Sequence, residues 1–288
     1  MRITNSLEYQ TLSSNIETSL QTLTTVQSQI SSGKKLQTFS DDPAGAAQSL
    51  VLRSKLGDNA QYQRDATSAT AFLTASEGAL SSAGSILQSV RQIAVAGANS
   101  TQTPDSLAAL SSQVDGAIQQ LSQTANTQTE GRYLFGGTNT TTPPYDATQT
   151  YQGNTQAINS TLGPGYSVQI NTIGSAAFGP AFTALQTLKT DLGTGDAVAI
   201  SGDIGKIDTA LSALSSASAT AGAKANQATA ATAQLTRAQS DYQSAISNTE
   251  DVDLAQAYVQ LQSATNVYQA SLSVTAKAFQ YSLADYLH

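Results

Sequence analysis

The side chains that could carry out chemistry in this chain are few. Its 288 residues include no cysteine and one histidine, His288, which is the last residue. A Ser-His-Asp triad and a His- or Cys-based metal site both need such residues in a fixed arrangement. The sequence therefore predicts a protein that is not an enzyme, with no catalytic residue, no cofactor and no bound metal.

Two groups of carboxylates could in principle hold a cation: Asp41-Asp42, and Asp251 with Asp253. Each group stands directly before a run of regularly spaced apolar residues, and Asp is a preferred residue at the start of a helix. We interpret both groups as helix caps. An enzyme that works through carboxylates alone stays an alternative, although residues 132–180 offer it only Asp146.

The composition narrows the class of partner. Charged residues make up 11% of the chain, against about 25% in ordinary soluble proteins. The formal net charge of -7 argues against a nucleic-acid partner, because nucleic-acid binding needs a basic surface. No segment approaches the roughly 20 apolar residues of a transmembrane helix, and the first residues lack the apolar core of a secretory signal. We expect no membrane partner.

The first and last segments have the pattern of narrow amphipathic helices. Apolar residues recur every three or four positions in both, as they do in a coiled coil. We predict that these two stripes form the assembly interface of the protein. The stripe residues are Leu12, Ile16, Leu20, Leu23 and Ile30 in the first segment, and Leu254, Leu261, Tyr268, Leu272, Phe279 and Leu283 in the last.

Most residues between the two stripes also have helical spacing. Pro43 suits the first turn of a helix, which we predict to continue to Asn99. Its predicted buried face follows a strict seven-residue spacing: Leu52, Asn59, Ala66, Leu73, Leu80, Leu87 and Ala94. Further helices are predicted from Pro104 until Gly131 and from Phe182 onward.

The character of the sequence changes between these helices. Short runs that favour strands appear at 133–135, 157–159 and 167–171, separated by pairs that form turns. We therefore predict a mainly α fold, an elongated coiled-coil-like helical rod built from the N- and C-terminal segments, with a small β-rich insertion in the middle. Its expected parts are 1–35 plus 250–288 as terminal helices, 36–131 plus 181–249 as the rod domain, and 132–180 as the outer β-rich insertion.

Motifs at both ends of the chain resemble those of the flagellin superfamily. Ser31-Ser32-Gly33, followed by Asp41-Asp42-Pro43, is similar to the N-terminal signature of flagellins. Residues 250–255 and 276–279 resemble the matching C-terminal helix. Within the superfamily, Tyr133-Leu134-Phe135 and the glycines around it are similar to a motif of the hook-filament junction family. Filament flagellin stays the alternative.

The resemblance implies a structural subunit of the bacterial flagellum that joins the hook to the filament by polymerising through its terminal helices. The implied partners are further copies of the chain, flagellin and the preceding hook-associated protein 1, with an export chaperone at the C-terminal helix. The implied location is the extracellular flagellum, reached through the flagellar type III apparatus without a cleaved signal peptide.

Several points stay open in the sequence. We expect the terminal segments to be unfolded in the free subunit, because an isolated amphipathic helix is only marginally stable in water. An intramolecular coiled coil between the two segments is the alternative.

Tyr133 and Phe135 could form an exposed contact or could anchor the insertion to the helices. A needle or translocator protein of a virulence secretion system is another class of helical protein, but that class usually lacks the paired signatures found here at residues 30–33 and 41–43. A membrane-active helix would carry more basic residues than the one in the last helix, Lys277.

Overall fold

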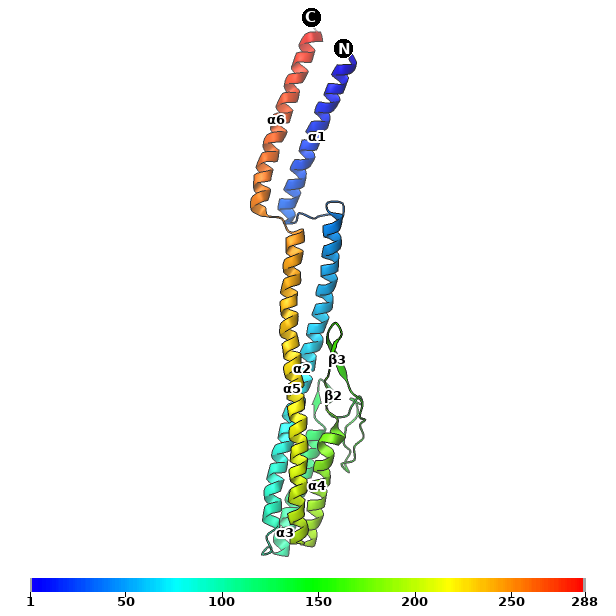
Figure 1. Cartoon of the computed structure of the whole chain (residues 1–288), viewed down its shortest axis with the longest axis vertical. Coiled ribbons are helices and arrows are strands. Elements are labelled where there is room, and N and C mark those ends of the chain that lie inside the picture. The colour runs from blue at the N-terminus through cyan, green and yellow to red at the C-terminus, as the bar shows by residue number, and fades with distance from the viewer. Residues whose placement is uncertain (1, 287–288) are drawn as a thin grey trace. The chain divides into compact units, whose positions relative to one another are not determined.

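The computed structural model describes the backbone of residues 2–286, and the side chains of residue 7 and residues 9–277. Within this range there are six helices and two small sheets (Figure 1). The helices are α1 (Arg2–Ser32), α2 (Pro43–Gly97), α3 (Pro104–Ala125), α4 (Gly174–Thr194), α5 (Ala197–Glu250) and α6 (Leu254–Tyr286). The strands are β1 (Gln128–Thr129), β2 (Arg132–Tyr133), β3 (Asn159–Gly163) and β4 (Tyr166–Gln169). The predicted class, mainly α with a small β-rich insertion, is confirmed.

The chain forms two compact units, and each contains residues from both halves of the chain. The first unit comprises the residues up to Gly57 and those from Gln239 onward, and the second comprises Asp58–Ala238. Both boundaries fall inside long helices, α2 and α5. In neither unit does a described helix have the length and apolar character needed to cross a membrane.

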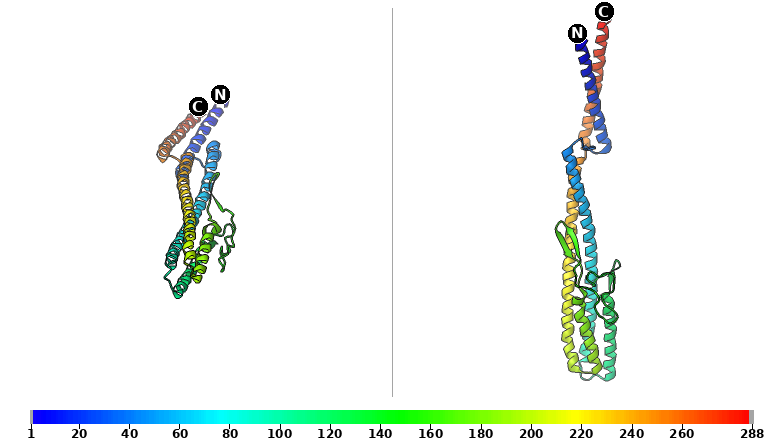
Figure 2. Two further views of the ribbon diagram at one scale, coloured as in Figure 1. Left: turned by 60° about the horizontal axis from the view of Figure 1, so that its bottom comes forward. Right: turned by 90° about the vertical axis from the view of Figure 1, so that its right-hand side faces the viewer.

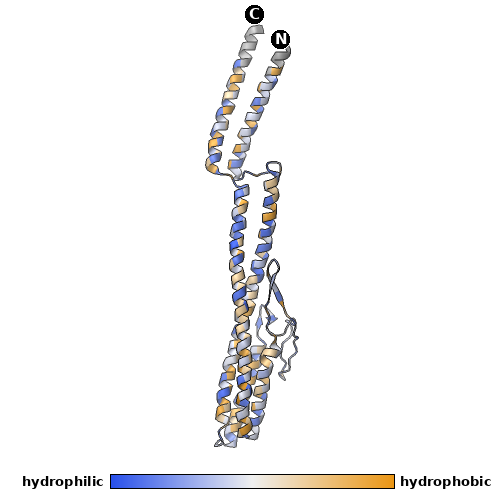
Figure 3. Ribbon diagram, viewed as in Figure 1, coloured by the Kyte–Doolittle hydropathy of each residue, from blue (hydrophilic) through white to orange (hydrophobic). Residues whose placement is uncertain are grey.

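In the first unit, α1 and α6 run antiparallel and side by side (Figures 1 and 2). Val26 of α1 and Ala257 of α6 are buried, and Leu261 and Tyr268 of α6 are partly buried. Hydrophobic residues recur along both helices among polar ones (Figure 3). α1 and α6 thus pair within one chain.

In the second unit, α2 and α5 lie antiparallel and α3 and α4 pack beside them (Figure 2). The Asn59 side chain donates a hydrogen bond of 2.9 Å to the carbonyl oxygen of Leu235, which sets α2 against α5. The predicted row of α2 is buried from Asn59 to Ala94, while Leu52 is only partly buried. Small buried residues of α5, such as Ala221 and Ala228, allow the close approach that this row requires.

The β-rich segment differs in detail from the prediction. β1 pairs with β2 and β3 pairs with β4, both antiparallel. The run predicted at 133–135 is a strand only at Tyr133, because the side chains of Leu134 and Phe135 enter the core instead. Helix α4 begins at Gly174, inside the segment predicted to be β-rich up to residue 180. There the Gly174 N–H donates to the Phe135 carbonyl oxygen, and a Cβ at Gly174 would lie 2.6 Å from that oxygen.

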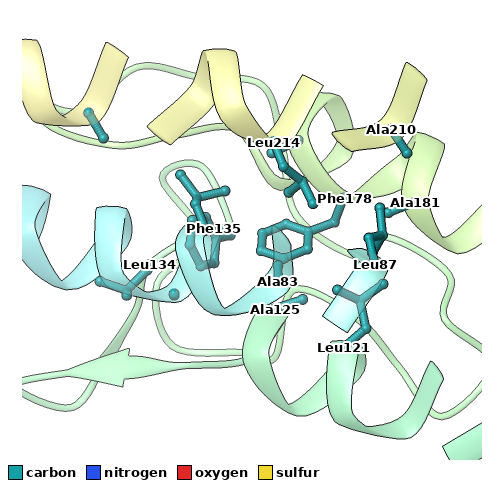
Figure 4. Packing of buried hydrophobic residues seen from close by; sticks show 14 of the residues in the cluster. Ala83, Leu87, Leu121, Ala125, Leu134, Phe135, Phe178, Ala181, Ala210 and Leu214 are labelled. Atoms are coloured by element: carbon teal, nitrogen blue, oxygen red, sulfur yellow. The ribbon is translucent and has the colours of Figure 1, made fainter. Parts of the chain in front are cut away.

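Phe135 anchors the β-rich segment to the helices. It is 0% exposed, and its ring meets that of Phe178 in α4 edge to face, with ring centroids 4.8 Å apart. Figure 4 shows both rings among Leu121 of α3 and Leu214 of α5. Of the two sequence alternatives, the structure confirms the anchor for Phe135; Tyr133 is partly buried in β2.

Replacing this anchor should destabilise the second unit. Phe135→Ala is expected to lower its free energy of unfolding by about 3–5 kcal/mol, because a large buried ring leaves a cavity. Urea unfolding followed by circular dichroism measures this change. The control is Val198→Ala, at a side chain that is 83% exposed, which should change stability by no more than about 0.5 kcal/mol. Equal effects of the two variants would contradict the anchoring role.

Candidate functional site

The N-terminal signature forms the turn between α1 and α2. Gly33 ends α1 with a φ of 72°, a conformation that glycine adopts without strain. The hydroxyl oxygen of Ser32 accepts hydrogen bonds from the Lys34 N–H at 3.2 Å and from the Gln37 side chain at 3.0 Å. The Ser31 hydroxyl donates back to the carbonyl oxygen of Ser28 at 3.0 Å. The small polar residues of the signature therefore close the end of α1.

Of the two aspartates of the signature, Asp42 caps a helix as the sequence predicted, whereas Asp41 closes the turn before it. Asp41 accepts from the N–H groups of Gln37 and Thr38 at 2.9 and 2.8 Å. These hydrogen bonds, with that to Thr38 foremost, lower the pKa of Asp41. Asp42 accepts from the N–H groups of Ala44 and Gly45 at 3.1 and 3.0 Å, directly before Pro43 opens α2.

The C-terminal signature meets this turn, although the two are more than 200 residues apart in the sequence. The Lys35 N–H donates to the carbonyl oxygen of Glu250 at 2.7 Å, and the Val252 N–H donates to that of Gly33 at 3.0 Å. Asp253 then caps α6 through the N–H groups of two following residues. We call the contact of residues 33–36 with residues 250–252 the motif junction.

Glu250 is the centre of the motif junction. Its side chain is only 10% exposed. It accepts hydrogen bonds from the Nε and Nη2 atoms of Arg53 at 2.9 and 2.7 Å, and also from the Lys34 ammonium and the Ser49 hydroxyl. These donors, with Arg53 first, lower the pKa of Glu250 to about 2. One carboxylate thereby connects the end of α5 to α2 and to the turn after α1.

Sequence reasoning missed this role of Glu250. The residue was placed only in the motif of residues 250–255 that resembles the C-terminal helix of flagellins. A usable signal was present, because Glu250 is the only glutamate after Glu130 in a chain with few charges. In the described part of the chain, no three His, Cys, Asp or Glu side chains gather closely enough to hold a metal ion.

An apolar groove of about 340 Å³ lies beside the motif junction. Leu36, Phe39 and Leu50 line it, together with Arg53 and Glu250. Phe39 and Leu50 are 65% and 61% exposed. Within the first unit, the groove therefore presents large apolar side chains to the solvent.

The predicted assembly residues fall into three groups. Those partly buried are Leu12, Ile16, Leu23, Ile30, Leu261 and Tyr268. Those exposed by more than two fifths of their surface are Leu20, Leu254 and Leu272. The side chains of Phe279 and Leu283 lie outside the described residues. The prediction missed a second exposed row on α6, in which Val259, Val267 and Val274 are 71%, 52% and 57% exposed.

The fold and the motif junction define a helical protein in which the two end segments of the chain pair in one unit. Residues 3–140 match the family described as the bacterial flagellin N-terminal helical region, and residues 204–287 match the bacterial flagellin C-terminal helical region. Together these matches cover most of the chain. The chain belongs to the flagellin family.

Individual relatives come from two branches of flagellar proteins. Flagellar hook-associated protein 3 of Salmonella typhimurium is 31% identical over 180 residues, covering 62% of this chain and 57% of the relative. The protein of that name from Escherichia coli is 32% identical, covering 52% of this chain and 48% of the relative. Flagellin of Salmonella typhimurium is 29% identical, covering 48% and 28%. The chain thus spans about half the length of the hook-associated relatives that it matches.

Solved structures share the fold. A flagellar hook-associated protein from Vibrio parahaemolyticus superposes with a TM-score of 0.68 at 20% identity, covering 73% of this chain and 100% of that one. FlgL of Bacillus cereus superposes with a TM-score of 0.62 at 24% identity, covering 68% and 99%.

The motif junction should make the first unit sensitive to acid. Since the Glu250 pKa is lowered from 4.5 to about 2, its stabilising contribution is complete above pH 4.5 and is lost as the pH falls toward 2. Glu250→Gln should lower the free energy of unfolding by about 1–3 kcal/mol at neutral pH, through weakened charge-assisted hydrogen bonds. It should also remove this acid-dependent loss.

The matched control is Asp251→Asn. This side chain is 46% exposed and lies 3.6 Å from the Lys34 ammonium, so its removal should cost less than about 1 kcal/mol. Unfolding measured at several pH values compares both variants with the parent chain. An unchanged acid profile in Glu250→Gln would contradict the central role of that carboxylate.

Proposed function

We propose that this chain is a hook-filament junction subunit of the bacterial flagellum, of the hook-associated protein 3 type. One observation carries the proposal. The match to hook-associated protein 3 covers 62% of this chain and 57% of that relative, whereas the match to flagellin covers 48% of this chain and 28% of that relative. Residues 3–140, which match the flagellin N-terminal family, include Phe135, the buried anchor of the motif similar to the junction family.

The subunit polymerises through its terminal helices. α6 carries no charged residue between Leu254 and Ala276, yet it exposes Tyr258 and a row of valines. Transfer of each large apolar side chain from water into a contact contributes about 1.5–3 kcal/mol. A handful of such residues on each helix is enough to favour association once the helices are ordered. The prediction that α1 and α6 become ordered only on assembly is part of this proposal.

The partners are further copies of the chain, flagellin on one side and hook-associated protein 1 on the other. Before assembly, an export chaperone holds the C-terminal helix, and the subunit leaves the cell through the flagellar type III apparatus. The low charge and the narrow stripes of α1 and α6 support this route, because a helix with a narrow stripe is marginally stable by itself and unfolds at little cost. The subunit acts as a structural component and carries out no reaction.

Filament flagellin is the second candidate. The observation in its favour is that both terminal segments match families described as bacterial flagellin regions. The two candidates differ in which neighbours the subunit meets and in how many copies assemble. A genetic experiment separates them.

Deletion of the gene for this chain should leave hooks in place without filaments, with flagellin shed into the medium. Electron microscopy of the cells and immunoblotting of the medium measure both results, and restoring the gene should restore filaments. A shortened filament, or one of altered composition, would instead identify the chain as a filament flagellin.

A charge placed on the α6 stripe should block incorporation. The Leu272 side chain is 42% exposed, so it is open to contact with a neighbouring subunit. Leu272→Asp introduces a carboxylate that this contact would bury without a partner. Cells that carry this variant should lack filaments while the purified chain keeps its helical content; Leu261→Asp should act in the same way. Ser273→Asp, an exposed neighbour with the same added charge, should assemble normally. Normal filament attachment by Leu272→Asp would rule out the stripe as the assembly contact.

A further inference from the structure

A carboxylate occupies a core position of the second unit. The buried face of α5 runs through Ile200, Ile207, Ala210 and Leu214 at the alternating steps of a coiled coil. The position between Ile200 and Ile207 belongs to the same face, and it holds Asp203, whose side chain is 0% exposed. An aspartate is rarely buried without a partner for each oxygen. Its presence here calls for a specific interaction.

Among the described residues, only one of the two Asp203 oxygens has a donor. Oδ1 accepts a hydrogen bond of 2.8 Å from the Lys206 ammonium, one turn along α5. Oδ2 is buried and has no hydrogen-bond partner in the part of the chain that the structure describes. An acceptor left unpaired in the core costs free energy, typically about 1–3 kcal/mol. A donor that reaches Oδ2 would remove this cost.

The group beside Asp203 is another carboxyl. Asp191, in the last turn of α4, lies within hydrogen-bonding reach of the Asp203 side chain. Burial, followed by the contact with Asp203, raises the pKa of Asp191. Asp196 adds to this shift, and Lys206 opposes it. When Asp191 binds a proton, its hydroxyl becomes the donor that Oδ2 lacks.

Charged groups of the neighbouring helices are engaged elsewhere. Arg91 of α2 is 2.7 Å from Asp208, and Asp115 of α3 is 2.5 Å from Lys189. Asp105 of α3 is exposed in the first turn of its helix. The cation that faces the pair is Lys206, which contacts the other oxygen of Asp203.

We propose that Asp191 holds a proton and donates it in a hydrogen bond to Asp203, and that the pair so forms a carboxyl clasp that fastens α4 to α5. With the proton bound, the Asp191 hydroxyl donates to Asp203 Oδ2, and the pair carries one negative charge opposite Lys206. Without it, two carboxylates face each other, and that of Asp203 is completely buried. The clasp thus makes the second unit more stable in acid, opposite to the acid-sensitive motif junction of the first unit.

The direction of the pH dependence follows from proton linkage. Because the Asp191 pKa lies above its ordinary value of 3.8 in the folded protein, the clasp contributes fully below that pH. Its contribution is lost as the pH rises through the raised pKa. Across this window, the folding equilibrium constant falls by up to about tenfold per pH unit.

The test compares Asp191→Asn with the matched control Asp196→Asn in the full chain. The side-chain amide that Asp191→Asn introduces can donate to Asp203 Oδ2 at every pH, so the loss of stability with rising pH should disappear and neutral stability should increase. Asp196 caps α5 through the N–H groups of Val198 and Ala199, and Asn caps helices about equally well. Asp196→Asn removes the same charge nearby and should keep the pH dependence.

Urea unfolding from about pH 4 to 7 measures the difference between each variant and the parent chain. Carboxyl-carbon NMR of the parent chain gives a second readout, in which Asp191 should titrate above its ordinary value. The clasp is refuted if Asp191→Asn keeps the parent's pH dependence, if Asp196→Asn abolishes it equally, or if the Asp191 carboxyl titrates at or below 3.8. Failure of Asp191→Asn to fold would also refute it, since the amide should strengthen the contact.

Discussion

The pairing of narrow helix faces from opposite halves of the chain is the constraint on which both units depend. In the second unit, α2 of the first half packs against α5 of the last half, through alanines and leucines that are almost completely buried. In the first unit, α1 and α6 repeat this arrangement with fewer buried side chains. Because a narrow stripe cannot be buried by its own helix, α1 depends on α6 for its buried contacts, and α2 depends on α5.

Apolar stripes with a seven-residue repeat specify register poorly, since a slip by one repeat again places alanine and leucine in the contact. Polar groups with few possible partners supply the missing specificity. Glu250 finds Arg53, Lys34 and Ser49 together in one alignment only, and the Asn59 side chain meets the Leu235 carbonyl oxygen in one register of α2 against α5. Breaking such a set leaves charged or polar groups unpaired, which costs more than shifting small apolar contacts.

The sequence predicted the features that depend on local pattern. The row from Ala66 to Ala94 is buried as its spacing required, and Asp42 caps α2 as its place before Pro43 required. Features that depend on distant partners were not predictable in this way. The partners of Glu250 lie about 200 residues away in the sequence, so no local pattern pairs them. The run predicted at 167–171 overlaps β4, whereas β3 lies almost entirely beyond the run predicted at 157–159, because Ser, Thr and Gly in β3 give little alternation between apolar and polar positions.

The distribution of charge connects the fold to the proposed assembly. The chain carries a net charge of -7, which would oppose close packing of copies if it were spread evenly. The uncharged run of α6 from Leu254 to Ala276 avoids this repulsion, while its exposed valines present apolar surface to the solvent. At the motif junction, Arg53 and Lys34 offset the negative charge of Glu250, so these charges align the segments within the unit. An acidic protein can therefore present terminal helices whose contacts with further copies are governed by apolar burial, with charge fixing only the alignment within the subunit.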